Sequence, residues 1–338
     1  MNIEERIHQF EQIVRQAQED GAYPGAVALV GQHDKLLCRF ACGDAQQVPH
    51  KRAMEINTRF DLASLTKVTA TLPLILLLLQ QNKLQLETRL GEVLTGLCPE
   101  NADIAIFELL THTAGLKPFY DLYTMGETRL ERIASVKSTP PETPRKEAVI
   151  YSDNSFVLLG EAAEACFGMP LNIAARTFVW EPLNMLDTTF NPPQDVPFAA
   201  TEQRETYVQY GNVHDENCAS LDGVAGHAGA FSTADDLAKY CRMLASNDEN
   251  NLVSQEWLNR AAKCYTPGMG DNRGLGFVVY REREGGNVIG HTGFTGTAFW
   301  VDRMTGLYGI LLTNRVHPTR ANTAIFEVRK QAIQVLFD

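Results

Sequence analysis

Apolar positions near the N-terminus recur at helical spacing. They predict an amphipathic helix that carries Ile3, Ile7, Phe10, Ile13, Val14 and Ala17 at 3.6-residue spacing and is followed by Gly21 as a C-cap. Two short apolar runs follow, Ala26 to Val30 and Leu36 to Phe40, and the turn residues between them predict a strand hairpin.

Beyond the hairpin the pattern becomes helical and then returns to strands. A long buried helix is predicted from about Ser64 to Gln81, followed by mixed helices and loops, with proline-rich loops at 139–144 and 191–193. From about Gly276 onward, three apolar runs predict strands at Phe277–Tyr280, Ala298–Val301 and Tyr308–Leu312. A final amphipathic helix carries Ile325, Val328, Ile333 and Leu336.

This order of elements predicts an α/β (α+β) fold whose sheet is built from both ends of the chain. We expect a discontinuous sheet domain from residues 1–75 and 225–338, and a mainly helical inserted domain from residues 76–224. The active site is expected at their interface.

Composition narrows the class of protein. With 338 residues, 44% hydrophobic and 21% charged, the chain is typical of a globular protein with a sizeable core. The net charge of −11 argues against nucleic acid and against an anionic membrane surface as partners, because both require a basic surface.

The cysteines and the N-terminus bear on location. Seven scattered cysteines without a Cys-x-x-Cys pair are typical of a reduced compartment and supply no zinc site. The first twenty residues lack an apolar signal region, and the most apolar run, Leu72 to Leu79, is far shorter than the roughly 18 residues of a membrane span. We expect a cytoplasmic protein without membrane contact, unless a leader has been removed.

Ser64 and Lys67 are the first candidate catalytic residues. Positions i and i+3 share a helix face, so the Lys67 amine is expected beside the Ser64 hydroxyl. A desolvated lysine has a lowered pKa, and its neutral amine can then accept the serine proton. The alternative at this point is a solvated lysine at a helix start, since Ser-x-x-Lys occurs by chance about once in a chain of this length.

Three further triplets contain candidate partners, two of them alternatives for one tyrosine. Tyr151-Ser152-Asp153 offers a tyrosine that can act as a general base beside a lysine, and Tyr210-Gly211-Asn212 is a rival of similar shape. His291-Thr292-Gly293 follows an apolar run, where a strand edge can supply an oxyanion N–H. Taken singly, a packed tyrosine and a structural histidine remain the alternatives.

In this order, Ser-x-x-Lys, a tyrosine triplet and a Lys/His-Thr-Gly triplet resemble the penicillin-recognising serine enzymes. The chain is similar to their class C β-lactamase branch, which includes D-amino-acid peptidases and carboxylesterases. Four segments carry the likeness over most of the chain: Phe60–Lys67, Leu109–Leu116, Tyr151–Phe156 and Gly226–Thr233. The resemblance implies an antiparallel sheet flanked by helices, and its spacing selects Tyr151 over Tyr210.

The resemblance also implies a mechanism. Ser64 attacks a carbonyl while Lys67 and Tyr151 shuttle its proton, and the N–H groups of Ser64 and Phe294 bind the oxyanion. Tyr151 then protonates the leaving group and later activates water. Substrate contacts are expected from Asp153, His291, Thr292, Gly293 and Phe294, and further candidate cleft residues are His214, Asp215 and His227.

Two departures point away from a dedicated β-lactamase. Asp153 replaces an asparagine that contacts the substrate amide in such lactamases, and His291 replaces a lysine. A neutral or partly charged imidazole binds a carboxylate less strongly than an ammonium does. We therefore expect a hydrolase of small esters or short D-amino-acid peptides that needs no cofactor and no metal.

Three alternatives remain beside it. They are a true class C-like β-lactamase, a non-catalytic penicillin-binding or sensor relative, and a metal enzyme built on His214, Asp215 and His227. The last lacks a His-Glu-x-x-His pattern. No Gly-x-Ser-x-Gly elbow of the α/β-hydrolase type is present. These motifs do not specify the physiological substrate or the oligomeric state.

Overall fold

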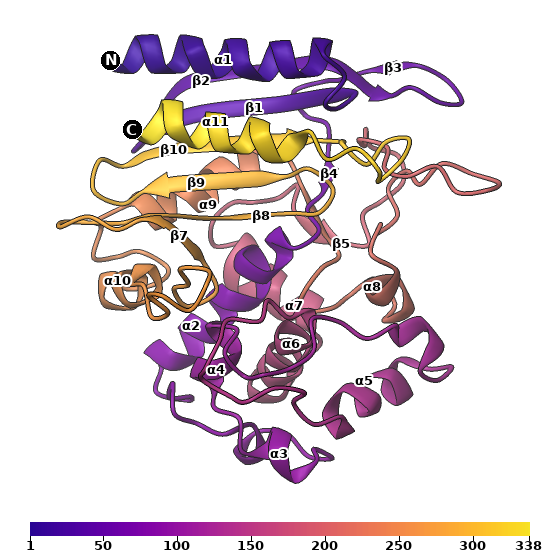
Figure 1. Ribbon diagram of the computed structural model, residues 1–338, viewed down its shortest axis with the longest axis vertical. Coiled ribbons are helices and arrows are strands. Elements are labelled where there is room, and N and C mark those ends of the chain that lie inside the picture. The colour runs from indigo at the N-terminus through magenta and orange to yellow at the C-terminus, as the bar shows by residue number, and fades with distance from the viewer.

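Both ends of the chain build one seven-stranded antiparallel sheet (Figure 1). This computed structural model describes all residues from Met1 to Asp338. The strands lie in the order β3-β2-β1-β10-β9-β8-β7. Their bounds are β1 Gly25–Gln32, β2 Lys35–Gln46, β3 Arg52–Ala53, β7 Val278–Arg281, β8 Val288–Thr292, β9 Ala298–Asp302 and β10 Leu307–Thr313. The central pair β1 and β10 places Ala28 opposite Leu311, so the N- and C-terminal segments meet in the middle of the sheet.

Two terminal helices cover one face of this sheet. Helix α1 (Ile3–Glu19) and helix α11 (Ile325–Phe337) lie side by side, with α1 against β1 and β2 and α11 against β9 (Figure 1). They bury Phe10, Val14 and Leu336 against Trp300 and Leu311 of the sheet. The side chain of Asn2 caps α1, and Gly21 follows its end in a left-handed conformation. The predicted terminal helices and the N-terminal hairpin are confirmed.

The other face packs on a larger core and on the helices that lie below the sheet in Figure 1. Helix α9 (Ala234–Ala245) lies directly against β1, β9 and β10. The remaining α-helices are α2 Leu72–Gln80, α3 Pro99–Ala102, α4 Ile106–Leu110, α5 Arg129–Ser138, α6 Asp153–Phe167, α7 Leu171–Ala175, α8 Glu216–Ser220 and α10 Gln255–Ala262. The 3₁₀ turns are Leu90–Glu92 and Leu122–Thr124, and a π turn spans Arg176–Trp180.

A second, three-stranded sheet lies below the large one. Its order is β4-β6-β5, with bounds Phe60–Asp61 for β4, Thr189–Phe190 for β5 and Ala230–Ser232 for β6. The expected α/β class with an antiparallel sheet is confirmed, and residues 139–144 and 191–193 are loops as predicted. The division into two domains at residues 75/76 and 224/225 stays a prediction.

The helix that follows Ser64 differs from expectation in its first turns. Residues Lys67–Thr71 form a π turn, in which the N–H of Leu72 donates to the carbonyl of Lys67, and α2 continues from there. The prediction of one regular helix was wrong in this respect. Such π turns inside helices are frequent at functional sites.

No single helix is long and apolar enough to cross a membrane, although the bent pair Asp153–Phe167 and Leu171–Trp180 passes that test jointly by length and composition. The cytoplasmic location stays an expectation from the sequence.

Candidate active site

Ser64 lies in a tight turn between β4 and the helix that leads into α2. Its neighbour Ala63 has a φ of +46°, a left-handed conformation that is uncommon for a residue with a Cβ. The Ser64 Oγ lies 2.9 Å from the Nζ of Lys67, one helical turn later. The lysine is fully buried, so the pair lies at the floor of the site.

Lys67 carries a positive charge in this arrangement. Its Nζ donates to a carboxylate oxygen of Asp153 at 2.7 Å and to the carbonyl of His227 at 3.2 Å. Burial alone lowers the pKa of Lys67, but Asp153 and Tyr151 raise it more, and the net pKa lies above the ordinary value. The expectation that desolvation would leave a neutral amine was wrong, because the buried lysine has an anionic partner.

Tyr151 lies directly beside this lysine. The Lys67 Nζ is 4.9 Å from the centre of the Tyr151 ring, and the ring of His112 packs on Tyr151 with centres 4.7 Å apart. The guanidinium of Arg273 lies over the same tyrosine at 5.1 Å. By contrast, the rival Tyr210 lies against Phe198 and accepts its N–H at another part of the surface.

The His-Thr-Gly triplet forms the end of β8. His291 is buried, and its ring centre is 5.9 Å from that of Tyr151. Burial, together with the charges of Arg273 and Lys67, holds the pKa of His291 well below its ordinary value, so the imidazole is neutral. Its Nδ1 lies 2.9 Å from the Thr292 carbonyl and therefore carries the proton.

Two backbone N–H groups at the site have no acceptor in the protein. They belong to Ser64 and Phe294, the pair that the resemblance names as oxyanion donors. Arg329 holds the turn that carries Phe294 in place, because its guanidinium donates to the carbonyls of Gly293 and Thr297 at 2.7 and 2.8 Å. Preorganised N–H donors of this kind stabilise a tetrahedral oxyanion.

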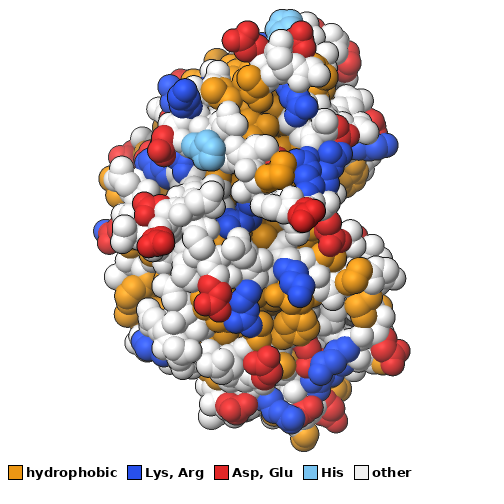
Figure 2. Space-filling view, turned by 90° about the vertical axis from the view of Figure 1, so that its left-hand side faces the viewer, with side chains coloured by type: hydrophobic (Ala, Val, Ile, Leu, Met, Phe, Trp, Pro, Cys, Tyr) orange, Lys and Arg blue, Asp and Glu red, His pale blue; other side chains and the backbone are white.

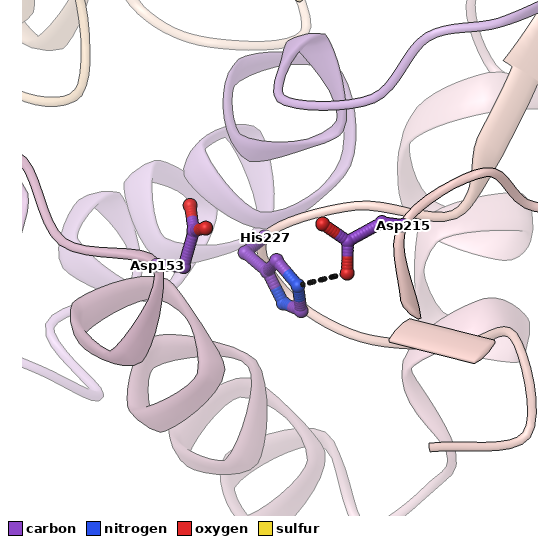
Figure 3. Close-up of side chains that lie close together, drawn as sticks. All are labelled: Asp153, Asp215 and His227. Atoms are coloured by element: carbon purple, nitrogen blue, oxygen red, sulfur yellow. Dashed lines mark hydrogen bonds and ion pairs between the residues drawn. The ribbon is translucent and has the colours of Figure 1, made fainter. Parts of the chain in front are cut away.

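Asp215 and His227 form a pair beside Lys67, whose Nζ donates to the His227 carbonyl at 3.2 Å. Figure 3 shows Asp215 pointing toward His227, and its carboxylate lies 3.0 Å from the imidazole Nε2. Burial raises the pKa of Asp215, but His227 and the N–H of Cys218 lower it more, so the carboxylate is ionised. The third candidate, His214, stacks its ring on Phe294 and binds Glu202 at 3.2 Å.

Asp153, Asp215 and His227 form a group that can hold a cation. Their ligand atoms all lie within 4.8 Å of one another (Figure 3). The Lys67 ammonium already binds one oxygen of Asp153, so a metal ion would have to compete with that amine. The absence of a metal requirement stays a prediction.

A cavity of about 640 Å³ opens above Ser64. An indentation between the sheet and the helical part is visible at the right edge of Figure 2, with acidic and basic side chains on its rim. The predicted site residues that line the cavity are Ser64, Tyr151, Asp153, His214, Asp215, His291, Thr292, Gly293 and Phe294. Lys67 and His227 do not line it and lie beneath its wall.

Four residues of the site were not singled out in the sequence. Asp61 and His112 stand inside family-like segments, and that position is their only signal. Arg273 and Arg329 line the cavity but belong to no motif, because only the folded chain brings them beside Tyr151 and Gly293.

The fold and the site define a hydrolase of the serine β-lactamase type. The Beta-lactamase family model matches residues 10–333, and the chain belongs to this family. The resemblance found in the sequence is therefore confirmed.

Relatives in the family include proteins named as an amidase and as a carboxypeptidase. The N-acetylmuramyl-L-alanine amidase of Bacillus subtilis (strain 168) is 29% identical over 346 residues, covering 87% of this chain and 78% of that protein. A putative D-alanyl-D-alanine carboxypeptidase of Escherichia coli (strain K12) is 28% identical over 366 residues, covering 93% and 83%.

Solved structures show the same fold. EstCE1, a hydrolase with promiscuous acyltransferase activity, superposes with a TM-score of 0.80 at 20% identity and covers 98% of each chain. A class C β-lactamase also superposes with a TM-score of 0.80, at 16% identity, and covers 100% of this chain and 98% of that one.

Proposed function

We propose that the chain is a serine hydrolase that forms a covalent acyl-enzyme on esters or on D-amino-acid amides and peptides. The observation that carries the proposal is the 2.9 Å contact between Ser64 Oγ and Lys67 Nζ, at the floor of a cavity that also receives two free N–H groups. A nucleophile, a proton acceptor and oxyanion donors are the parts that acyl transfer requires.

The geometry supports the following sequence of steps. Ser64 attacks the substrate carbonyl, and its proton passes to the pair formed by Lys67 and Tyr151. Because Lys67 is an ammonium at rest, this pair must first lose a proton, and the rate should rise with pH as it does so. The N–H groups of Ser64 and Phe294 hold the oxyanion, and Tyr151 protonates the leaving group. Tyr151 then activates a water molecule, which attacks the acyl-enzyme carbonyl, and the Ser64 hydroxyl is released.

The charges of the cavity favour a substrate that bears a carboxylate. Arg273 is 5% exposed, and its Nε and Nη1 have no acceptor, while its Nη2 binds Asp271 at 2.8 Å. Because His291 is neutral, Arg273 is the cation nearest to Tyr151 on that wall of the cavity. A short peptide with a free C-terminal carboxylate would complement this charge.

Two features favour an ester or peptide over a β-lactam. Asp153 is bound to Lys67 and brings a negative charge to the position from which lactamases of the resembling branch contact an amide. His291 supplies no positive charge where those lactamases carry lysine. We propose small molecules or short peptides as substrates.

Intact-protein mass spectrometry tests the proposal. A fluorophosphonate, or a penicillin, should add one adduct to the native chain, and Ser64→Ala should take up none. Ser155→Ala is the matched control, since this serine is 1% exposed and does not line the cavity. A native protein that takes up neither reagent, or a Ser64→Ala variant that is still labelled, would show that the proposed function is wrong.

A further inference from the structure

A buried carboxylate that takes no part in the proposed chemistry lies three residues before Ser64. Asp61 ends strand β4 and is 2% exposed. One of its oxygens accepts the N–H of Ala63 at 2.8 Å, and the other accepts the N–H of His214 at 2.6 Å. It has no ion pair with a lysine, arginine or histidine, so two backbone dipoles alone hold its charge.

The first of these bonds acts on the nucleophile turn. Ala63 adopts a φ of +46°, which a residue with a Cβ disfavours, and its N–H is tied two residues back to Asp61. The peptide between Ala63 and Ser64 carries the Ser64 N–H. The dihedral angles of Ala63 therefore set the direction of the first oxyanion donor.

The second bond reaches the loop before α8. His214 directly precedes Asp215, the ionised partner of His227, and the His214 ring stacks on Phe294. The carbonyl of Asp61 also accepts the hydroxyl of Thr295 at 2.7 Å, next to the second oxyanion donor. Asp61 thus contacts the nucleophile turn, the loop that carries Asp215 and the turn that carries Phe294.

We propose that Asp61 is a positioning residue, whose ionised carboxylate directs the Ser64 N–H into the cavity and holds the Asp215 loop against the nucleophile. The inference rests on the proposed role of Ser64. An ionised carboxylate accepts hydrogen bonds through both oxygens, whereas protonation turns one oxygen into an O–H donor and leaves it a weaker acceptor. An asparagine turns its NH₂ group toward one of the two donors, so Asp61→Asn breaks one link in either orientation.

The buried negative charge of Asp61 lowers the stability of the folded protein. This effect on stability distinguishes a role in positioning from a purely structural role, in which the ionised carboxylate would stabilise the fold. Burial raises the pKa of Asp61 to about 6, Asp215 adds to the rise, and the two N–H bonds oppose it. Besides Asp215, the titratable side chain that faces Asp61 is Cys218. Strand β6 and Thr295 also pack against Asp61 but contribute no titratable group. A raised carboxyl pKa means that the folded state binds the proton more tightly. Stability therefore falls as pH rises through the interval up to about 6.

The experiment compares Asp61→Asn with Asp236→Asn. Asp236 is a control for the loss of a buried carboxylate, since it is 1% exposed, accepts the Asp187 N–H at 2.8 Å and lies outside the cavity, although unlike Asp61 it also pairs with Lys239 at 2.8 Å. At pH 7.5 we expect Asp61→Asn to lower kcat for a p-nitrophenyl ester by about 10- to 100-fold, because misdirected donors cost rates of this order. KM should change little, and Tm should be no lower than in the control.

The pH dependence supplies a readout that needs no variant. Labelling of native Ser64 by a neutral fluorophosphonate should show an additional decline below about pH 6, where Asp61 becomes protonated, beyond the gradual decline set by the Lys67–Tyr151 pair. Folded Asp61→Asn should show the gradual decline alone. If the variant does not fold, a native labelling profile from pH 7.5 to 5 without an added inflection near pH 6 overturns the inference. If it folds, native kcat and a native pH profile overturn it. A native protein that is not labelled at all instead refutes the proposed role of Ser64.

Discussion

The Nζ of Lys67 lies 2.7 Å from a carboxylate oxygen of Asp153, closer than the 2.9 Å that separates it from the Ser64 hydroxyl. The lysine is fully buried, and its anionic partner keeps its pKa above the ordinary value despite that burial. Asp153, the third residue of the tyrosine triplet, thus controls the charge of Lys67, which contacts the nucleophile Ser64.

Asp153→Asn should shift the pH dependence of catalysis. Without the carboxylate, burial favours the neutral amine, so the pKa of Lys67 falls. The rising limb of kcat/KM should therefore move to lower pH, by about one to three units for the loss of a close opposite charge. The measurement is kcat/KM for a p-nitrophenyl ester between pH 6 and 10.

Asp121→Asn is the control for that prediction. Asp121 also lines the cavity but makes no contact with Lys67. Its pH profile should match that of the native protein. Equal profiles for Asp153→Asn and the native protein would contradict the assignment of Asp153 as the residue that holds the lysine charged.

Much of the fold could be predicted because its signals are local. The spacing of Phe10, Val14 and Ala17 identifies α1, and alternating turn and apolar residues identify the hairpin of β1 and β2. Ser64 and Lys67 could be paired for the same reason, since one helical turn separates them. The ion pair of Lys67 with Asp153 could not, because it joins segments that are remote in sequence.

Arg273→Gln should reduce discrimination in favour of substrates with a free carboxylate. A hydrogen bond to a charged group contributes about 1.5–3 kcal/mol, and 1.4 kcal/mol corresponds to tenfold. The kcat/KM ratio of a D-amino-acid dipeptide to its C-terminal amide should thus fall by about 10- to 100-fold. Arg281→Gln is the control, because Arg281 pairs with Asp338 near the C-terminus and does not line the cavity. A ratio that stays at the native value would exclude Arg273 as the carboxylate ligand.

The place of Arg273 in the site could not be predicted from sequence patterns. It lies in a loop between α10 and β7, and its only signal is its residue type. Folding places its guanidinium over Tyr151, from a segment more than a hundred residues away in sequence. A contact of this kind depends on how the helical region packs against the sheet, which no local periodicity encodes.

Esters should be turned over faster than cephalosporins. Asp153 brings an anion and His291 a neutral imidazole to the two positions where the resembling lactamases carry asparagine and lysine. The lost charge-assisted contact of the lysine alone weakens binding by about tenfold or more. We expect kcat/KM for a p-nitrophenyl ester, normalised to spontaneous hydrolysis, to exceed that for a chromogenic cephalosporin. The opposite order would assign the chain to the β-lactamases proper.

Gly293→Ala should disable the site by steric displacement. A Cβ at Gly293 would lie 2.2 Å from the Thr297 Oγ1 and 2.3 Å from the carbonyl of Leu62, so the turn that carries Phe294 must move away from the nucleophile segment. Overpacking of this kind costs about 1–3 kcal/mol of stability, and a donor displaced by about 1 Å costs about 100-fold in kcat. Gly96→Ala is the control, since its Cβ meets open space and only its left-handed φ of +77° is strained. Thermal unfolding and ester hydrolysis, measured together, should show a loss of kcat in Gly293→Ala alone. A Gly293→Ala variant that keeps native kcat would contradict the assignment of the Phe294 N–H as an oxyanion donor.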